Sequence, residues 1–246
     1  FPMGFIFRNS GAFFLRRSFK GLDLYPTIFK QYVKNLVYEG YPIEFFIEGG
    51  RTRTGKPALP KYGFLNYLIE AIEEGYNKDL VFVPVSINYD RILEEASYLQ
   101  ELRGKEKEKE SFKALMEGRK LLKRKYGKVY VSINRPFTLR EIEGEDLKGQ
   151  TLPEAISMRV IQKINQATMV TPYALVSATI LLLALKGFPR QLLKERLASL
   201  YDYLKYFDAI LSDSLRNRDN LGEIEDTVIA TFLEDKILEK LTFEGE

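Results

Sequence analysis

Residues 80–87 read LVFVPVSI, an apolar stretch rich in β-branched side chains and bounded by loop signals, which predicts a buried strand. Two more runs have the same character, Glu44–Glu48 (EFFIE) and Lys128–Ile133 (KVYVSI), and Phe13–Leu15 is a plausible fourth strand. Residues 25–37 and 62–74 lie between these runs and carry apolar side chains at helical spacing. Because strands alternate with helices, we expect an α/β fold with a mostly parallel or mixed sheet that helices cover on both faces.

The strand signals end after residue 170, and helical signals follow. Thr151-Leu-Pro-Glu154 has the pattern of a helix start, which Thr171-Pro172 repeats in part. Residues 173–185 are almost wholly apolar but fall short of the about 20 residues that cross a bilayer, which favours a buried helix over a membrane-dipping segment. Residues 192–206 and 227–241 look amphipathic. We therefore predict a core domain over residues 1–168 and a helical subdomain over residues 169–246.

The composition limits the chemistry. The 246 residues are 45% hydrophobic and 29% charged, as in a packed globule, and a net charge of +3 is too small to indicate nucleic-acid binding. The lack of cysteine excludes disulfides and thiolate metal sites. The lack of histidine removes the commonest general base and the commonest zinc ligand. The first residues are apolar, without an initiator Met or a signal-peptide pattern, so we expect a fragment that begins inside a domain.

The strongest chemical feature follows EFFIE. In the arginine loop, which we define as residues 49–56 (GGRTRTGK), Gly49 and Gly50 permit a tight turn and close backbone approach, and Arg51, Arg53 and Lys56 concentrate positive charge. Guanidinium groups match phosphate oxygens in pairs, so the loop suits a phosphorylated ligand, although a basic surface turn is the alternative. A nucleotide P-loop fits poorly because Pro57 stands where Ser or Thr would hold magnesium.

Three other segments carry weaker signals. Residues 11–19 (GAFFLRRSF) place an arginine pair, Arg16 and Arg17, after apolar residues, and a purely structural pairing with carboxylates is the alternative. Residues 83–91 (VPVSINYDR) form a strand that leads to a polar end. The run KEKEKE at 105–110 lies in a charged helical stretch over residues 91–125, for which a solvated face is favoured.

Taken together and in order, these segments resemble the bacterial membrane type of glycerol-3-phosphate acyltransferase. That family has a His-x-x-x-x-Asp box, an aromatic segment ending in Arg-Arg (here residues 11–19), an F-x-E-G-x-R-[ST]-R loop (here residues 46–53, FIEGGRTR) and a V-P-[VI] strand (here residues 83–85). FPMG at 1–4 and ELRGKEKEKES at 101–111 extend the resemblance, which is good over about the first 135 residues. Gly50 and the long charged region favour this branch over the lysophosphatidic acid acyltransferases.

The resemblance implies a reaction and a departure from the family pattern. Members transfer an acyl group from acyl-CoA or acyl-carrier protein to the first hydroxyl of glycerol 3-phosphate, with no metal or redox cofactor. The histidine of the box acts as general base there, and residues 1–246 contain no histidine, so we expect this chain to be nearly inactive alone. Dihydroxyacetone phosphate as acceptor, or a non-catalytic module that binds phosphate or membrane, are the alternatives.

The resemblance also implies roles for individual residues. Arg51 and Arg53 would bind the acceptor phosphate, with Arg16 and Arg17 as a second contact and Lys56 as a weaker one. Glu48 would hold the arginine loop or order the acceptor, and Pro84 would shape the pocket wall. The remaining supporting residues of the pocket are Phe13, Gly49 and Gly50. We expect peripheral or monotopic association with the cytoplasmic face of a membrane and no nucleic-acid partner.

Overall fold

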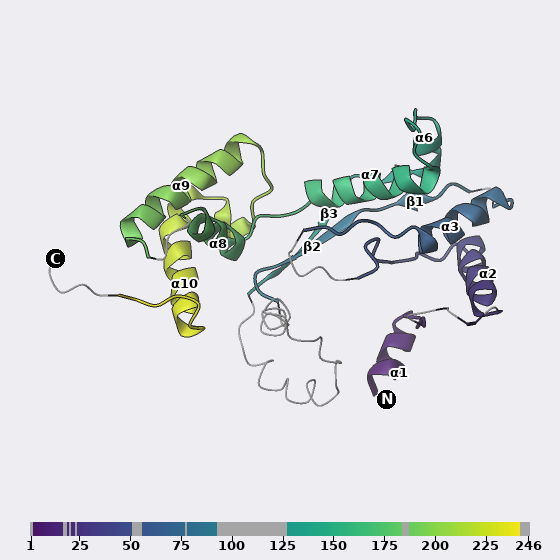
Figure 1. Cartoon of the computed structure of the whole chain (residues 1–246), viewed down its shortest axis with the longest axis horizontal. Helices are drawn as coiled ribbons and strands as arrows, with labels where there is room; N and C mark the ends of the chain where they lie inside the picture. The colour runs from purple at the N-terminus through teal and green to yellow at the C-terminus, as the bar shows by residue number, and fades with distance from the viewer. Residues whose placement is uncertain are drawn as a thin grey trace. The chain divides into compact units, whose positions relative to one another are not determined.

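The computed structural model describes residues 2–16, 19, 21–22, 24–50, 56–76, 78–92, 127–183 and 187–241 (Figure 1). The chain divides into two compact units, each built from separate stretches of sequence. The first comprises Phe1–Gly50, Leu59–Leu80 and Thr138–Ser157, and the second comprises Arg51–Ala58, Val81–Phe137 and Met158–Glu246. The domain boundary predicted between residues 168 and 169 stays a prediction.

The first unit is built on a helix pair. Its helices are α1 (Pro2–Asn9), α2 (Leu24–Tyr38), α3 (Gly63–Glu73) and α6 (Leu139–Glu143). The helices predicted over residues 25–37 and 62–74 are therefore confirmed as α2 and α3. Their buried side chains, Phe29, Val33 and Val37 on α2 and Leu65, Leu68 and Ile69 on α3, repeat at the spacing of one helix face. This apolar seam sets how α2 and α3 pack.

Between α2 and α3, the strand predicted over Glu44–Glu48 is wrong: residues 41–46 have no regular secondary structure, and residues 47–48 turn. Side chains still alternate, with Ile47 buried and Glu44 exposed, and the Phe45 ring lies 4.9 Å from that of Phe64. Alternating apolar and polar side chains suit a strand, but a strand also needs a hydrogen-bonded neighbour. The strand predicted at Phe13–Leu15 is wrong too, because this segment is irregular and packs on α2 through Phe13.

The strands occur as two pairs. The prediction over residues 80–87 becomes β1 (Val81–Phe82) and β2 (Val85–Tyr89), interrupted beside Pro84, whose nitrogen cannot donate to a ladder. The strand predicted at 128–133 is confirmed as β3 (Val129–Ile133), and β4 is Phe137–Thr138. β1 pairs with β4, and β2 pairs with β3 in antiparallel register from Val85↔Ile133 to Tyr89↔Val129. The fold mixes helices and strands, but the expected mostly parallel sheet is not confirmed.

The two faces of the β2–β3 pair differ. On one face, Ser86 is buried and its hydroxyl lies 3.4 Å from that of Thr168, while the Asn88 side-chain oxygen accepts the Met169 N–H at 3.1 Å. On the other face, every side chain is apolar and exposed: Val85, Ile87, Tyr89, Val129, Val131 and Ile133. Within the described residues, the expectation that helices cover both faces of the sheet is therefore wrong.

Helix α7 (Leu152–Gln166) starts where the sequence predicts. The Glu154 carboxylate accepts the Thr151 N–H at 2.8 Å, which is the return bond of a capping box. That bond lowers the pKa of Glu154. The predicted helical region over residues 91–125 lies almost entirely outside the described residues.

The end of the second unit is a bundle of three helices, α8 (Pro172–Leu183), α9 (Arg190–Tyr206) and α10 (Leu221–Glu234). Two short 3-10 turns, Asp213–Leu215 and Arg218–Asn220, lie between α9 and α10. Their shared core includes Leu175, Leu197, Tyr201, Leu215 and Val228. The first two helices agree with prediction, but α10 begins and ends several residues before the predicted 227–241. The first turns of α10 carry charged residues, and even Glu225 on its inward side is fully buried. The apolar spacing therefore does not reveal where this helix begins.

Helix α8 is apolar around its whole circumference, yet it is buried on one side only. Leu175, Val176 and Thr179 are buried, whereas Leu181 is 78% and Leu182 71% exposed. Across the described ranges, none of the helices combines the length and the apolar character that a membrane crossing requires.

Candidate functional site

The arginine loop follows a tight turn in the first unit. Ile47 is buried, and the Gly49 N–H donates to the Phe46 carbonyl at 2.9 Å. Gly49 has φ +62°, in the left-handed region that a side chain disfavours. The Lys61 N–H then donates to the Ile47 carbonyl at 2.9 Å. This bond places the backbone of Lys61 beside the turn.

Not every predicted residue of the loop is described. Arg51 and Arg53, the residues predicted to bind phosphate, lie outside the described residues. Glu48 is half-buried and Gly50 is exposed, with open space where a Cβ would stand. A close neighbour stands only at Gly49, where an added Cβ would lie 2.7 Å from the Lys61 Cδ, and not at Gly50.

The segment before α2 is anchored by aromatic contacts. The Phe13 ring lies 5.4 Å from that of Tyr32 in an edge-on arrangement and 6.2 Å from that of Phe29. Arg16 is exposed, its N–H donates to the Tyr25 hydroxyl at 3.3 Å, and its guanidinium carbon lies 5.9 Å from the centre of the Tyr25 ring. A cation over an aromatic face is a favourable arrangement that leaves the guanidinium edge available. Arg17 lies outside the described residues.

Two predicted residues belong to the second unit. Pro84 is buried, and its carbonyl accepts the Asn134 N–H at 3.0 Å, which fixes the bend between β1 and β2. Lys56 is exposed. The structure therefore anchors Phe13 and Arg16 to α2 and holds Gly49 against Lys61. Pro84 lies in the connection between two strands. These contacts do not test whether the predicted residues form one common site.

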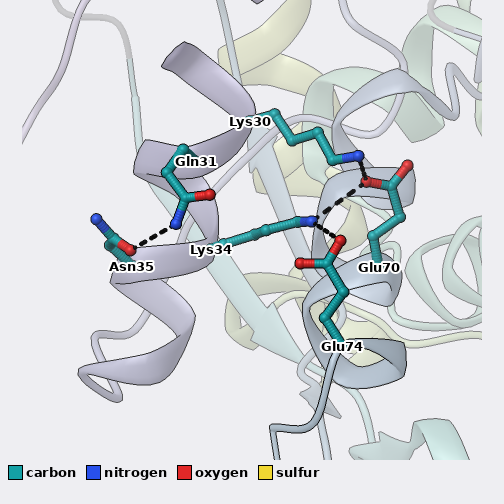
Figure 2. Close-up of polar contacts among 6 residues, drawn as sticks. All are labelled: Lys30, Gln31, Lys34, Asn35, Glu70 and Glu74. Carbon is teal, nitrogen blue, oxygen red and sulfur yellow. Dashed lines mark hydrogen bonds and ion pairs between the residues drawn. The ribbon is translucent and has the colours of Figure 1, made fainter. Parts of the chain in front are cut away.

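A charged cluster joins α2 to α3, and the sequence predictions did not include it (Figure 2). Lys34 of α2 is only 3% exposed and pairs with Glu74 of α3, and its Nζ lies 3.7 Å from a Glu70 oxygen. Lys30, one turn earlier, also pairs with Glu70. Hydrogen bonds lower the pKa of Glu74 through Lys34 and raise the pKa of Lys30 through Glu70. The cluster therefore joins the two helices of the pair by charge as well as by apolar packing.

The described residues do not gather three or more potential metal-ligating side chains at any point. The first unit does hold Arg16, an exposed cation beside the Tyr25 ring. Such groups can bind and orient an anion.

Two family models match different parts of the chain. A family model described as acyltransferase matches residues 1–88, which contain the arginine loop. A second model, described as the glycerol-3-phosphate acyltransferase C-terminal region, matches residues 98–243, more than half of the chain. The chain belongs to the glycerol-3-phosphate acyltransferase family.

Individual relatives carry the same description. The glycerol-3-phosphate acyltransferase of Actinobacillus pleuropneumoniae serotype 5b (strain L20) is 36% identical over 99% of this chain and 31% of its own length. That of Pasteurella multocida (strain Pm70) is 34% identical over 98% of this chain and 30% of its own length. That of Pseudomonas syringae pv. tomato (strain ATCC BAA-871 / DC3000) is 39% identical over 73% of this chain and 23% of its own length. The chain spans about a third or less of these curated relatives.

Membership of the glycerol-3-phosphate acyltransferase family confirms the resemblance drawn from the four sequence blocks. Three contacts were not predicted from the sequence: Tyr25 with Arg16, Lys61 with Gly49, and Lys34 of α2 with Glu70 and Glu74 of α3. The contact of Lys34 had a visible signal in the sequence. Lys30 and Lys34 are spaced at i and i+4, as are Glu70 and Glu74, so each helix presents two like charges on one face. Nothing in the sequence indicates that Lys61 would contact Gly49.

Proposed function

We propose that these residues are part of an enzyme that transfers an acyl group from acyl-CoA or acyl-carrier protein to the sn-1 hydroxyl of glycerol 3-phosphate, giving lysophosphatidic acid. Family membership supports the reaction class. The supporting observation within the chain is the tight turn at Gly49, after which the sequence carries two arginines and Lys56 over a short stretch. Clustered guanidinium groups on such a loop suit a small dianionic phosphate.

In this proposal the residues of the chain bind and orient the acceptor. Arg51 and Arg53 hold the phosphate as charge-assisted donors, Arg16 and Arg17 add a second contact, and Lys56 adds a point charge. Glu48 orders the loop or the acceptor. Holding the acceptor in one pose lowers the entropic part of the barrier to acyl transfer. Transfer from a thioester to an alcohol is a single displacement, so we propose no metal or redox cofactor.

The proton of the attacking hydroxyl needs a base. By resemblance, this is the histidine of a His-x-x-x-x-Asp box, and residues 1–246 contain no histidine. A general base contributes about 10²–10⁴-fold to the rate. We therefore propose that residues 1–246 expressed alone have little acyltransferase activity.

The test uses the gene expressed with all of its coding sequence, in cells that lack their own glycerol-3-phosphate acyltransferase. Membranes are assayed with an acyl donor and either glycerol 3-phosphate or dihydroxyacetone phosphate. Arg51→Ala should raise the KM for the acceptor about tenfold or more, because it removes a charge-assisted phosphate contact. Arg216→Ala is the matched control, since Arg216 is highly exposed and pairs only locally with Asp213.

The same assay separates the alternatives. Lack of transfer to glycerol 3-phosphate by the wild-type protein would contradict the proposal, and turnover of dihydroxyacetone phosphate alone would assign the other acceptor. An acceptor KM that Arg51→Ala does not change would remove Arg51 from the phosphate site.

We also propose peripheral association with the cytoplasmic face of a membrane, supported by α1. Phe5, Ile6 and Phe7 are 73%, 52% and 45% exposed, and Arg8 lies in the last turn of the same helix. Apolar side chains beside a cation suit a lipid interface. The variant Phe5→Ser/Phe7→Ser should lower co-sedimentation with anionic phospholipid vesicles. Exposed Tyr203→Ser on α9 is the control, and equal sedimentation of all three proteins would contradict a role for α1.

A further inference from the structure

Three exposed side chains belong to the turn at which the arginine loop begins. We define the loop base as residues 46–49 and 59–61, all of which lie in the first unit. Leu59 is 86% exposed and Phe46 is 75% exposed, so both large apolar side chains lie mostly in water. Lys61 is exposed as well. The loop base therefore presents two bulky apolar groups and a cation on one short turn.

Backbone bonds and buried neighbours hold this turn in place. The Gly49 N–H donates to the Phe46 carbonyl, and the Lys61 N–H donates to the Ile47 carbonyl, both at 2.9 Å. The aliphatic stem of Lys61 packs over Gly49, where an added Cβ would lie 2.7 Å from the Lys61 Cδ. Ile47 and Pro60 are buried next to the exposed residues of the turn. The exposed side chains are therefore carried by an anchored backbone.

A lipid surface fits the loop base better than a protein partner does. A stable protein interface buries about 800 Å² on each partner, which requires a broad patch instead of two projecting side chains. A bilayer interface accepts a few apolar side chains to a depth of about 5–10 Å while cations stay at the headgroups. Because the N–H groups of Gly49 and Lys61 are already bonded within the protein, contact with lipid leaves neither of them without a partner.

Charge favours an anionic bilayer. The cations within residues 46–61 of the sequence are Arg51, Arg53, Lys56 and Lys61. The one carboxylate of this stretch is Glu48, which is half-buried. Basic residues near an anionic membrane are attracted to its headgroups. The long stem of Lys61 would let its ammonium stay at the headgroups while the apolar neighbours enter the interface.

We propose that the loop base is a second membrane contact of this protein, in addition to α1. Phe46 and Leu59 enter the interface of an anionic bilayer, and Lys61 meets the headgroup phosphates. This inference rests on the proposed peripheral association, but it does not depend on α1 or on any role of the loop arginines in acceptor binding. Because α1 and the loop base belong to the same compact unit, this unit carries both contacts.

Co-sedimentation with vesicles of equal parts phosphatidylglycerol and phosphatidylcholine tests the apolar part of the contact. The protein is expressed with all of its coding sequence. Phe46→Ser/Leu59→Ser should weaken vesicle binding about tenfold, because two apolar side chains no longer leave water on binding. Leu182→Ser/Tyr203→Ser is the matched control, since it also removes one aliphatic and one aromatic side chain, 71% and 59% exposed in the second unit. The control should bind like the wild type.

Lys61→Gln tests the part played by charge. It should weaken binding to the anionic vesicles about fivefold and leave binding to pure phosphatidylcholine vesicles unchanged. Lys61→Arg, which keeps the charge, should bind like the wild type on both. Phe46→Ser/Leu59→Ser should weaken binding to both kinds of vesicle. Inorganic phosphate should release no more protein than chloride at equal ionic strength, and release by phosphate alone would indicate a site for free phosphate and overturn the inference.

The remaining outcomes are distinct. A wild-type protein that binds neither kind of vesicle overturns the proposed peripheral association and this inference with it. A wild type that binds, with Phe46→Ser/Leu59→Ser binding equally well or the control losing as much, overturns the inference alone. Melting temperatures should be the same for Phe46→Ser/Leu59→Ser and the wild type, because both side chains are exposed. A marked fall would show that they pack inside the protein and would also overturn it.

Discussion

Lys34 lies in the apolar stripe of α2, beside Val33 and three residues before Val37, and its side chain is almost fully buried. A buried ammonium without partners would cost several kcal/mol, so its pairing with Glu70 and Glu74 is what makes the position tolerable. The sequence places a lysine here but cannot show that two glutamates about forty residues later face it.

This cluster gives a pH prediction. Lys34 lowers the pKa of Glu74 from its ordinary value of 4.5, so the unfolded chain takes up this proton at a higher pH than the folded chain does. The stabilisation is complete above about pH 5 and is lost as the pH falls through the lowered pKa. The melting temperature should therefore fall on acidification below pH 5, and Glu74→Gln should make that fall less steep.

Circular dichroism melts between about pH 3 and about pH 7, which span the titration range of carboxylates, would measure the effect. Glu143→Gln, on the exposed face of α6, is the control variant. An identical pH dependence in Glu74→Gln and the wild type would contradict a stabilising role for the cluster.

Among the elements, the β2–β3 pair differs most from prediction. The six side chains of its outer face are between 38% and 68% exposed, although all are apolar. The alternation that assigns residues to the two faces follows from the sequence. Which face is buried does not, because that depends on what packs against the pair. Ser86 and Asn88 point to the packed face through contacts with residues 168–169, so polar residues there take the place that apolar ones were expected to fill.

Substitutions on the exposed face of the β2–β3 pair and in the buried core should change the free energy of unfolding by very different amounts. Val131 is 62% exposed, so Val131→Thr should change the free energy of unfolding by less than about 0.5 kcal/mol. Phe137 is 2% exposed and its ring stacks 5.2 Å from that of Phe82, so Phe137→Ala should cost about 3–5 kcal/mol. Urea unfolding measures both, and a large loss in Val131→Thr would show that its face is buried in solution.

For the whole molecule, the predicted boundary after residue 168 can be tested through the bundle of α8, α9 and α10. The buried core of that bundle and the apolar residues packed on it all come from residues 170–232. Residues 169–246 expressed alone should therefore fold, with helical circular dichroism and one cooperative thermal transition. A broad, non-cooperative melt would contradict a separate subdomain and indicate that the bundle depends on the rest of the chain.

The family of the protein was predicted largely from the arginine loop. Its composition and the ordered blocks were enough to predict the family, which the comparisons confirm. The spatial arrangement of the predicted phosphate ligands stays a prediction, since Arg17, Arg51 and Arg53 lie outside the described residues. Lys61 emerged only from the structure, because its contact with Gly49 depends on how the loop closes.

The sequence alone determined the helices α2, α3, α7, α8 and α9. Helices follow from apolar spacing, start signals and stop signals that act within a few residues of one another. The tertiary structure decided that residues 44–48 have no strand partner, that β2 pairs antiparallel with β3, and that Lys34 is buried against α3. These outcomes depend on contacts between residues far apart in the chain, which local patterns do not encode.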